Sequence, residues 1–84
     1  MSSDGKGSLR EFIACLVRGI VDEPDVVRVT ETERAGLTTY EITVAPPDVA
    51  KVIGRHGRVV TALRNAARGA ALKSGRRVTV EILD

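Results

Sequence analysis

The chain has very little of the residue types that usually carry a recognisable chemistry. Cys15 is the only cysteine, so the sequence offers neither an internal disulfide nor a Cys-x-x-Cys metal site. Phe12 and Tyr40 are the only aromatic residues, and the apolar spacing around them predicts that both face a core. The sequence therefore excludes an aromatic stacking platform of the kind found in RRM and OB-fold proteins.

Long apolar runs are missing as well. The unbroken apolar stretches are only a few residues long, whereas a membrane-spanning helix needs about 20. Residues 1–7 lack the apolar run of a signal peptide, and we interpret them as a flexible lead-in to a single domain over residues 8–84. We therefore expect a cytoplasmic protein that does not associate with membranes.

The groups needed for catalysis are sparse and scattered. Most of the acidic residues lie in the first half of the chain, and the single His56 and the single Cys15 fall in different predicted elements. One histidine and one cysteine do not make a metal site. We therefore expect no enzyme activity, no cofactor and no bound metal, and we expect Cys15 to be a packed, unreactive thiol beside Phe12 and Leu16.

Acidic residues are also absent from one long segment, between Val49 and Val80. Residues 1–48 carry five Lys/Arg and nine Asp/Glu, whereas residues 49–84 carry eight Lys/Arg and two Asp/Glu. A solvated helix normally mixes charges of both signs, so a run of one sign favours an anionic partner. Solubility alone is the alternative explanation.

What the sequence does contain is clear periodicity. Residues 9–22 have the spacing of an amphipathic helix, with a capping box formed by Ser8 and Glu11 and a stop at Pro24. The apolar positions of this helix are Leu9, Phe12, Ile13, Leu16, Val17 and Ile20. Alternation then predicts two strands of a hairpin on either side of Ala35-Gly36, with Tyr40, Ile42 and Val44 on the face that meets the helix.

The second half predicts two helices and a third strand. After Pro46-Pro47, a short helix runs through Ile53, and the charge of Asp48 complements its dipole. A longer helix follows, with Ser74-Gly75 as its C-terminal cap, and a strand from Val78 to Ile82 ends the pattern. The expected inward residues of the longer helix are Val59, Val60, Leu63, Ala66, Ala67 and Ala70, and Gly69 is expected to allow close packing.

The order of these elements predicts the architecture. About thirty residues containing two helices separate the second and third strands, which is typical of a crossover between parallel strands. The second strand is then central, with the hairpin partner antiparallel on one side and the third strand parallel on the other. We expect an α+β domain in which a three-stranded mixed sheet is covered on one face by the helices.

One motif lies between the two helices of that crossover, in the acid-free segment. Gly54 and Gly57 are separated by two residues and preceded by the apolar pair Val52-Ile53, and Val60 follows three residues after the second glycine. Because glycine has no Cβ, such a turn lets main chain approach a ligand and present N–H groups to a phosphate.

With this motif and the α-β-β-α-α-β order, the sequence resembles the type II K-homology (KH) RNA-binding domain. The resemblance covers residues 8–83 and extends to the family of small bacterial proteins with a single KH domain, through the segment Val52–Ile82. It implies a largely sequence-tolerant binder of single-stranded RNA. It also implies a homodimer and a heteromer with a larger KH-containing RNA-binding protein.

Mapped onto this chain, the resemblance implies a site around the two glycines. The N–H groups of Arg55 to Arg58 are expected to meet phosphate, and Ile53 is expected to be mostly core while Val52 and Val60 partly line a groove opposite Val78–Val80. The full set of candidate RNA-binding residues is Lys51, Val52, Ile53, Gly54, Arg55, His56, Gly57, Arg58, Val60 and Arg64.

Three questions stay open at this point. His56 either donates to the RNA or is an ordinary solvated loop residue. Arg64 and Arg68, one helical turn apart, either extend the phosphate track or solvate the helix. Finally, the fold is either an RNA-binding module or mainly a module for dimerisation and protein interaction.

Overall fold

The computed structural model describes residues 5–83, and it has the predicted order of elements. Three short 3₁₀ turns, at Pro24–Val26, Pro46–Asp48 and Arg55–Gly57, lie between the main elements. The main elements are α1 (Gly5–Arg18), β1 (Arg28–Arg34), β2 (Leu37–Thr43), α2 (Val49–Ile53), α3 (Arg58–Leu72) and β3 (Arg77–Leu83). The α-β-β-α-α-β order of a type II KH fold is thereby confirmed.

The sheet has the predicted mixed topology, in the order β1-β2-β3. Strands β1 and β2 are antiparallel, with Arg34 opposite Leu37, and the two-residue turn between them has positive φ at both Ala35 and Gly36, which matches the twist of a tight hairpin. Strands β2 and β3 are parallel, with Leu37 opposite Arg77. The crossover that joins them contains α2, the glycine turn and α3.

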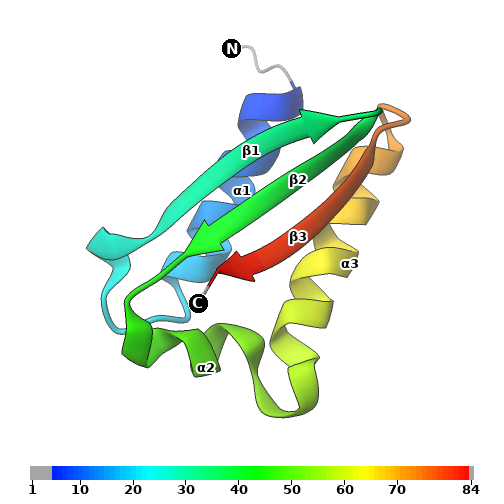
Figure 1. Cartoon of the computed structure of the whole chain (residues 1–84). Helices are drawn as coiled ribbons and strands as arrows, with labels where there is room; N and C mark the ends of the chain where they lie inside the picture. Colours follow the sequence, from blue (N-terminus) through cyan, green and yellow to red (C-terminus); the bar gives the residue numbers. More distant parts are fainter. Residues whose placement is uncertain (1–4, 84) are drawn as a thin grey trace.

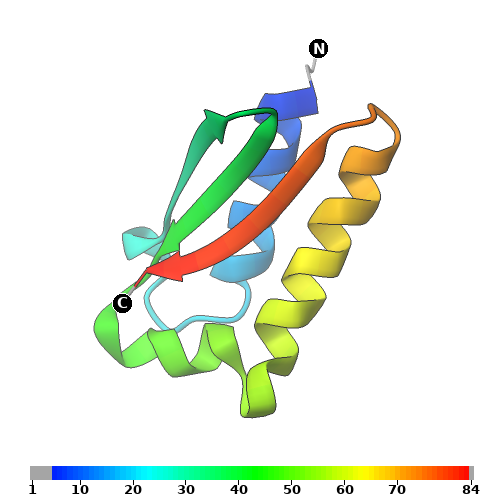
Figure 2. The same cartoon turned by 45° about the vertical axis from the view of Figure 1, so that its right-hand side comes forward.

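All three helices lie on one side of the sheet, as predicted. Figures 1 and 2 show α1 and α3 side by side behind it, with α2 across the end where β2 and β3 finish. The core between the layers is formed by Ile13 and Val17 of α1, Tyr40 and Ile42 of β2, and Val80 of β3, each at most 1% exposed. Among residues 5–83, no helix covers the opposite face of the sheet, and no helix is long and apolar enough to span a bilayer.

Helix α1 differs from the prediction at both ends and in the face that it buries. It begins at Gly5, before the expected cap at Ser8, whose side chain lies outside the described part of the structure. It ends at Arg18 rather than at residue 22, and Pro24 opens a 3₁₀ turn. Its buried residues are Leu9, Ile13, Ala14 and Val17. Compared with the predicted stripe, the buried face is rotated around the helix axis, away from Phe12 and Leu16 and toward Ala14.

The rotation leaves an unexpected apolar flank on α1. Phe12 is 44% exposed and Leu16 is 37% exposed, although both were expected in the core. Cys15 is exposed, so the expectation of a packed thiol was wrong. The reason is that Leu9, Ile13 and Val17 pack into the core, so the neighbouring flank with Cys15 and Leu16 borders an open groove beside α3.

Helix α3 buries Val60, Leu63, Ala67 and Ala71. The expected inward Ala70 is exposed, and a Cβ at Gly69 would meet nothing within 4 Å, so Gly69 does not serve close packing. The C-terminal cap is confirmed, because Gly75 has a φ of 67° and its N–H donates to Leu72 O at 3.0 Å. The N–H of Arg76 donates to Ala71 O at 3.1 Å, which completes a Schellman cap.

Candidate nucleic-acid interface

The Gly54–Gly57 turn has an unusual backbone that explains its two glycines. Gly54 has φ 79° and ψ 168°, a combination that is essentially restricted to glycine, and Gly57 is left-handed at φ 72° and ψ 16°. A Cβ at Gly54 would lie 2.4 Å from Cγ2 of Val59. His56 is also left-handed, at φ 56°, a conformation in which histidine is enriched among non-glycine residues. The turn thus folds tightly onto the start of α3.

The folded turn leaves fewer N–H groups for a ligand than we expected. The N–H of Gly57 donates to Gly54 O at 3.1 Å, and the N–H of Arg58 donates to Arg55 O, so both close the turn itself. Within residues 5–83, the N–H groups of Arg55 and His56 have no main-chain acceptor. The expected set of four donors is therefore reduced to two.

The start of α3 adds an electrostatic contribution to these donors. The N-cap residue is Gly57, and no side chain caps the helix there. The unsatisfied N–H groups of the first turn and the helix dipole both favour an anion at this end. Arg55, His56 and Arg58 are all exposed around it, and no acid in the described part of the chain forms an ion pair with them.

The apolar residues around the turn are arranged in the opposite way from the prediction. Val52 is 0% exposed, so it cannot line a groove, whereas Ile53 is 36% exposed rather than mostly core. The buried face of α2 passes through Asp48 and Val52, four residues apart, and a helix places the next residue about 100° away. Val60 keeps only 8% of its surface exposed and offers little to a ligand.

Asp48 has a role that sequence reasoning missed. Its carboxylate is 1% exposed, and although Asp48 lies at the N-cap of α2, as the predicted dipole role requires, it makes no cap hydrogen bond to that helix. Instead, it accepts the N–H groups of Asp22 and Glu23 at 3.2 and 3.1 Å, which lie 26 and 25 residues away. Asp48 therefore fixes the loop after α1 against the start of α2. The two prolines before it were the only sequence sign of a structured turn.

Lys51 belongs to the same cluster. Its Nζ lies 2.9 Å from Asp22 Oδ2, to which it donates, and 3.8 Å from Asp48 Oδ1. The hydrogen bond to Asp22, and then the charges of Asp22 and Asp48, raise the pKa of Lys51 above its ordinary value. This lysine is thus engaged by two carboxylates beside the turn.

Arg64 lies across the seam between α3 and β3. Its Nε donates to the main-chain oxygen of Val80 at 3.0 Å. Because β2 lies on the other side of β3, this carbonyl belongs to the free edge of the sheet. The side chains of Val78 and Val80 are 6% and 0% exposed, so the wall that β3 offers is its main-chain edge rather than these side chains.

The described residues contain no group of three or more His, Cys, Asp or Glu side chains placed to hold a metal ion. Of the predicted candidates, the structure gathers Ile53, Arg55, His56 and Arg58 at one exposed end of the molecule, around the two glycines. It buries Val52 and Val60, and it engages Lys51 and Arg64 with protein partners.

Comparisons with known proteins agree with this fold. The sequence pattern of the family described as KhpA/KhpB, KH domain, matches residues 10–82. A protein of Treponema pallidum named RNA-binding protein KhpA is 43% identical over 74 residues, which are 88% of this chain and 92% of that protein. RNA-binding protein KhpA of Caldanaerobacter subterraneus subsp. tengcongensis is 41% identical over 87% of this chain and 97% of its own length. The Chlamydia pneumoniae protein of the same name is 36% identical over 90% and 97%.

A solved structure supports the architecture. The chain matches the crystal structure of a single-residue variant of Aquifex aeolicus Era bound to GDP.AlF4-, with a TM-score of 0.65 and 18% identity, over 98% of this chain and 31% of that one. At this level of identity, the likeness concerns the fold alone. The family match over residues 10–82 and the three relatives at 36–43% identity show that the chain belongs to the KhpA/KhpB family of KH-domain proteins.

Proposed function

We propose that this protein binds single-stranded RNA and holds its backbone at the Gly54–Gly57 turn. The observation that carries the proposal is the turn itself, where two N–H groups without main-chain acceptors meet a helix start that no side chain caps. The relatives named RNA-binding protein KhpA support the choice of RNA as the anion.

In this proposal, a phosphate accepts the N–H groups of Arg55 and His56 in the field of the α3 dipole. The guanidinium groups of Arg55 and Arg58 flank the same backbone, and the half-exposed Ile53 is the apolar surface beside it. A KH site of this kind holds about four nucleotides. Because the contacts go to the backbone and no aromatic platform stacks the bases, we infer low sequence specificity and an affinity that depends strongly on salt.

A charge reversal at the tip of the turn tests the proposal. The variant R55D/H56D replaces both exposed side chains, and Asp tolerates the left-handed backbone at position 56. We expect it to lose binding to a labelled 12-nucleotide RNA in fluorescence anisotropy while its circular dichroism stays native. The control R10E/N65D makes the same change in net charge at two exposed helix positions. If R55D/H56D binds as tightly as wild type, the turn is not the site.

Salt dependence separates the proposed contacts from one another. Loss of one phosphate contact lowers the slope of log K against log salt by about 0.7 for a single strand. We expect this change for Arg55→Ala. For Lys51→Ala we expect a smaller change, because Lys51 already donates to Asp22 at 2.9 Å. Equal changes in the two variants would show that Lys51 leaves Asp22 to bind phosphate.

A binder of this kind would act on many RNAs, as a chaperone or a post-transcriptional regulator in the cytoplasm. We expect crosslinking in cells to recover many transcripts without a common sequence, and fractionation to place the protein with cytoplasmic RNA. The proposed activity is binding alone, so RNA should be recovered at full length after the titrations. Shortened RNA would show that the protein is an enzyme.

A second candidate function, assembly through protein contacts, is favoured by the apolar groove between α1 and α3. No charged residue lines this groove. Its lining residues are Cys15, Leu16, Gly19, Ile20, Val59, Ala62, Leu63 and Ala66. Phe12, at 44% exposure, extends this apolar surface along α1. We infer that a second copy of the chain covers it, because a domain of 84 residues buries little surface alone and gains from burying this flank.

Sedimentation tests this assembly with a matched pair of variants. Ala62 and Thr61 are neighbouring exposed residues of α3, but only Ala62 lines the groove. We expect wild type and Thr61→Glu to sediment as dimers and Ala62→Glu as a monomer. An unchanged dimer in Ala62→Glu would place the interface elsewhere. A wild-type monomer that binds a larger KH-containing protein, and loses it in Ala62→Glu, would identify the heteromer as the occupant instead.

A further inference from the structure

A second cationic site lies at the opposite end of α3 from the glycine turn. A hollow of about 480 Å³ opens there, between the end of α3 and the beginning of β3. It is lined by Leu37, Arg68, Leu72, Arg76, Arg77, Val78 and Thr79. Three of these seven residues are arginines and none is acidic, so the lining of the hollow is positively charged and otherwise largely apolar.

The three arginines differ in how they are held. Arg76 donates from Nη2 to the Tyr40 hydroxyl at 3.0 Å and lies 4.0 Å from Glu31 Oε2, and its side chain is only 19% exposed. Arg68 and Arg77 are exposed, and within residues 5–83 no hydrogen bond or ion pair engages either guanidinium. These two cations are therefore free to bind a ligand, whereas Arg76 shapes the wall behind them.

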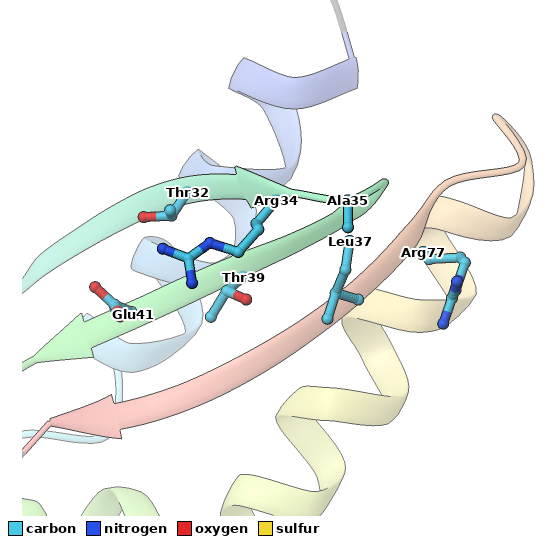
Figure 3. A pocket seen from close by; sticks show the side chains of 7 residues that line it. All are labelled: Thr32, Arg34, Ala35, Leu37, Thr39, Glu41 and Arg77. Atoms are coloured by element: carbon cyan, nitrogen blue, oxygen red, sulfur yellow. The ribbon is translucent and has the colours of Figure 1, made fainter.

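The apolar part of the hollow is open as well. Leu72 is 75% exposed, which is the largest exposure among the large apolar residues of the described chain. Figure 3 shows a neighbouring pocket on the outer face of the sheet, which shares Leu37 and Arg77 with this hollow, so both residues lie where the outer face meets the edge of β3. An apolar surface flanked by two guanidinium groups matches a nucleotide, which combines an apolar base with an anionic phosphate.

Between the hollow and the proposed RNA site, the α3–β3 seam carries a further arginine. Arg64 and Arg68 are one helical turn apart, and Arg64 lies over the Val80 carbonyl midway along β3. The middle of the outer sheet face is unsuitable for RNA because Glu41 and Glu81 are directly paired there. In Figure 3, Arg34 extends toward Glu41 on that face. The seam is thus the cationic route between the two ends.

We propose that this hollow is a second RNA contact, in which Arg68 and Arg77 bind phosphate and Leu37 and Leu72 support a base. The inference rests on the proposed RNA binding at the turn and extends its footprint. Helix α3 has 15 residues and is roughly 22 Å long at about 1.5 Å per residue. At the duplex spacing of about 3.4 Å per nucleotide, the closest spacing that a strand adopts, this length adds at most about six nucleotides to the four at the turn. The protein then contacts up to about ten nucleotides of single strand.

The length of the RNA gives the test. Binding of a 6-nucleotide and a 12-nucleotide single strand of mixed sequence is measured between 50 and 200 mM salt for wild type, R68A/R77A and the control R10A/R18A. The control removes the same charge from two exposed positions of α1. We expect R68A/R77A to lower the slope of log K against log salt for the 12-mer by about 1.4, that is, by about 0.7 for each lost phosphate contact. Between about 50 and 200 mM salt, the variant should then lose about sevenfold less affinity than wild type loses. We expect the slope for the 6-mer to stay close to that of wild type.

The possible outcomes are distinct. A 12-mer slope in R68A/R77A equal to that of wild type overturns the second contact, and it would leave an acidic protein segment as the ligand for the hollow. An equal loss in R10A/R18A overturns it too, because net charge alone would then explain the effect. Failure of the turn is a separate result, seen as unchanged binding of the 6-mer in R55D/H56D.

Discussion

Replacing Gly54 by alanine is expected to be far more costly than replacing Gly57. Gly54 has φ 79° and ψ 168°, and for a residue with a Cβ this backbone costs on the order of 1–3 kcal/mol. The new methyl group would also lie 2.4 Å from Val59 Cγ2 and 2.8 Å from Val59 N. Such overpacking adds about 1–3 kcal/mol. We therefore expect Gly54→Ala to lower the free energy of unfolding by about 2–6 kcal/mol.

Gly57 is the matched control within the same turn. Its backbone is left-handed, but a Cβ there would meet only Val60 Cγ1 at 4.0 Å, so the cost is the conformational one of about 1–2 kcal/mol. A chain of 84 residues has a total stability of about 4–13 kcal/mol. Gly54→Ala therefore removes a large share of that stability, whereas Gly57→Ala leaves the protein folded.

Urea unfolding followed by circular dichroism measures both variants. The slope with urea should stay constant, so that the shift in midpoint reports stability alone. The double variant G54A/V59A should recover part of the loss, because it removes the Cγ2 atom that the new methyl group meets. The steric reasoning would be refuted if Gly54→Ala lost no more stability than Gly57→Ala. It would also be refuted if the loss in G54A/V59A equalled the sum of the losses in Gly54→Ala and Val59→Ala.

Three further predictions concern stability. Asp48→Ala should cost about 3–5 kcal/mol in urea unfolding, because it leaves the N–H groups of Asp22 and Glu23 without their acceptor, and a loss below about 1 kcal/mol would contradict this role. Because the pKa of Lys51 is raised in the folded protein, the stability that its ion pairs contribute is complete below the ordinary pKa of 10.5 and is lost as the pH rises above it. The difference in urea midpoint between wild type and Lys51→Met should therefore be constant from pH 7 to 10 and become smaller above pH 10. Gly69→Ala should raise stability by about 0.5–1 kcal/mol, since that exposed helical glycine has nothing within 4 Å of a Cβ, and a lower thermal midpoint would contradict it.

Periodicity in the sequence was sufficient to predict the elements and their order. The alternation around Tyr40 and Ile42 identified the core face of β2, and the length of the crossover identified the parallel pairing of β3. Both patterns depend only on side-chain spacing along one element. The Gly54–Gly57 turn was found because its backbone demands glycine at Gly54, a local requirement that the sequence records directly.

The details that could not be predicted depend on contacts between distant residues. Lys51 meets Asp22 from 29 residues away, and Arg64 meets the Val80 carbonyl from 16 residues away. No local pattern reports such pairs. Likewise, which of the neighbours Val52 and Ile53 is buried depends on how the five-residue helix α2 is rotated. That rotation is fixed by the buried Asp48, whose partners lie beyond α1.

The crossover between β2 and β3 has a consequence for how the protein is made. Each pair in this parallel ladder joins residues 40 positions apart, such as Leu37 and Arg77, whereas the β1–β2 hairpin closes over two residues. The entropy of closing the long loop must be overcome before the ladder gains any hydrogen bond, so we expect β3 to join late. During synthesis, the glycine turn is made before β3, and until β3 is present α3 has no strand to pack against at that edge. We therefore expect the turn of a nascent chain to fold, and RNA binding to begin, only after β3 has been added to the sheet.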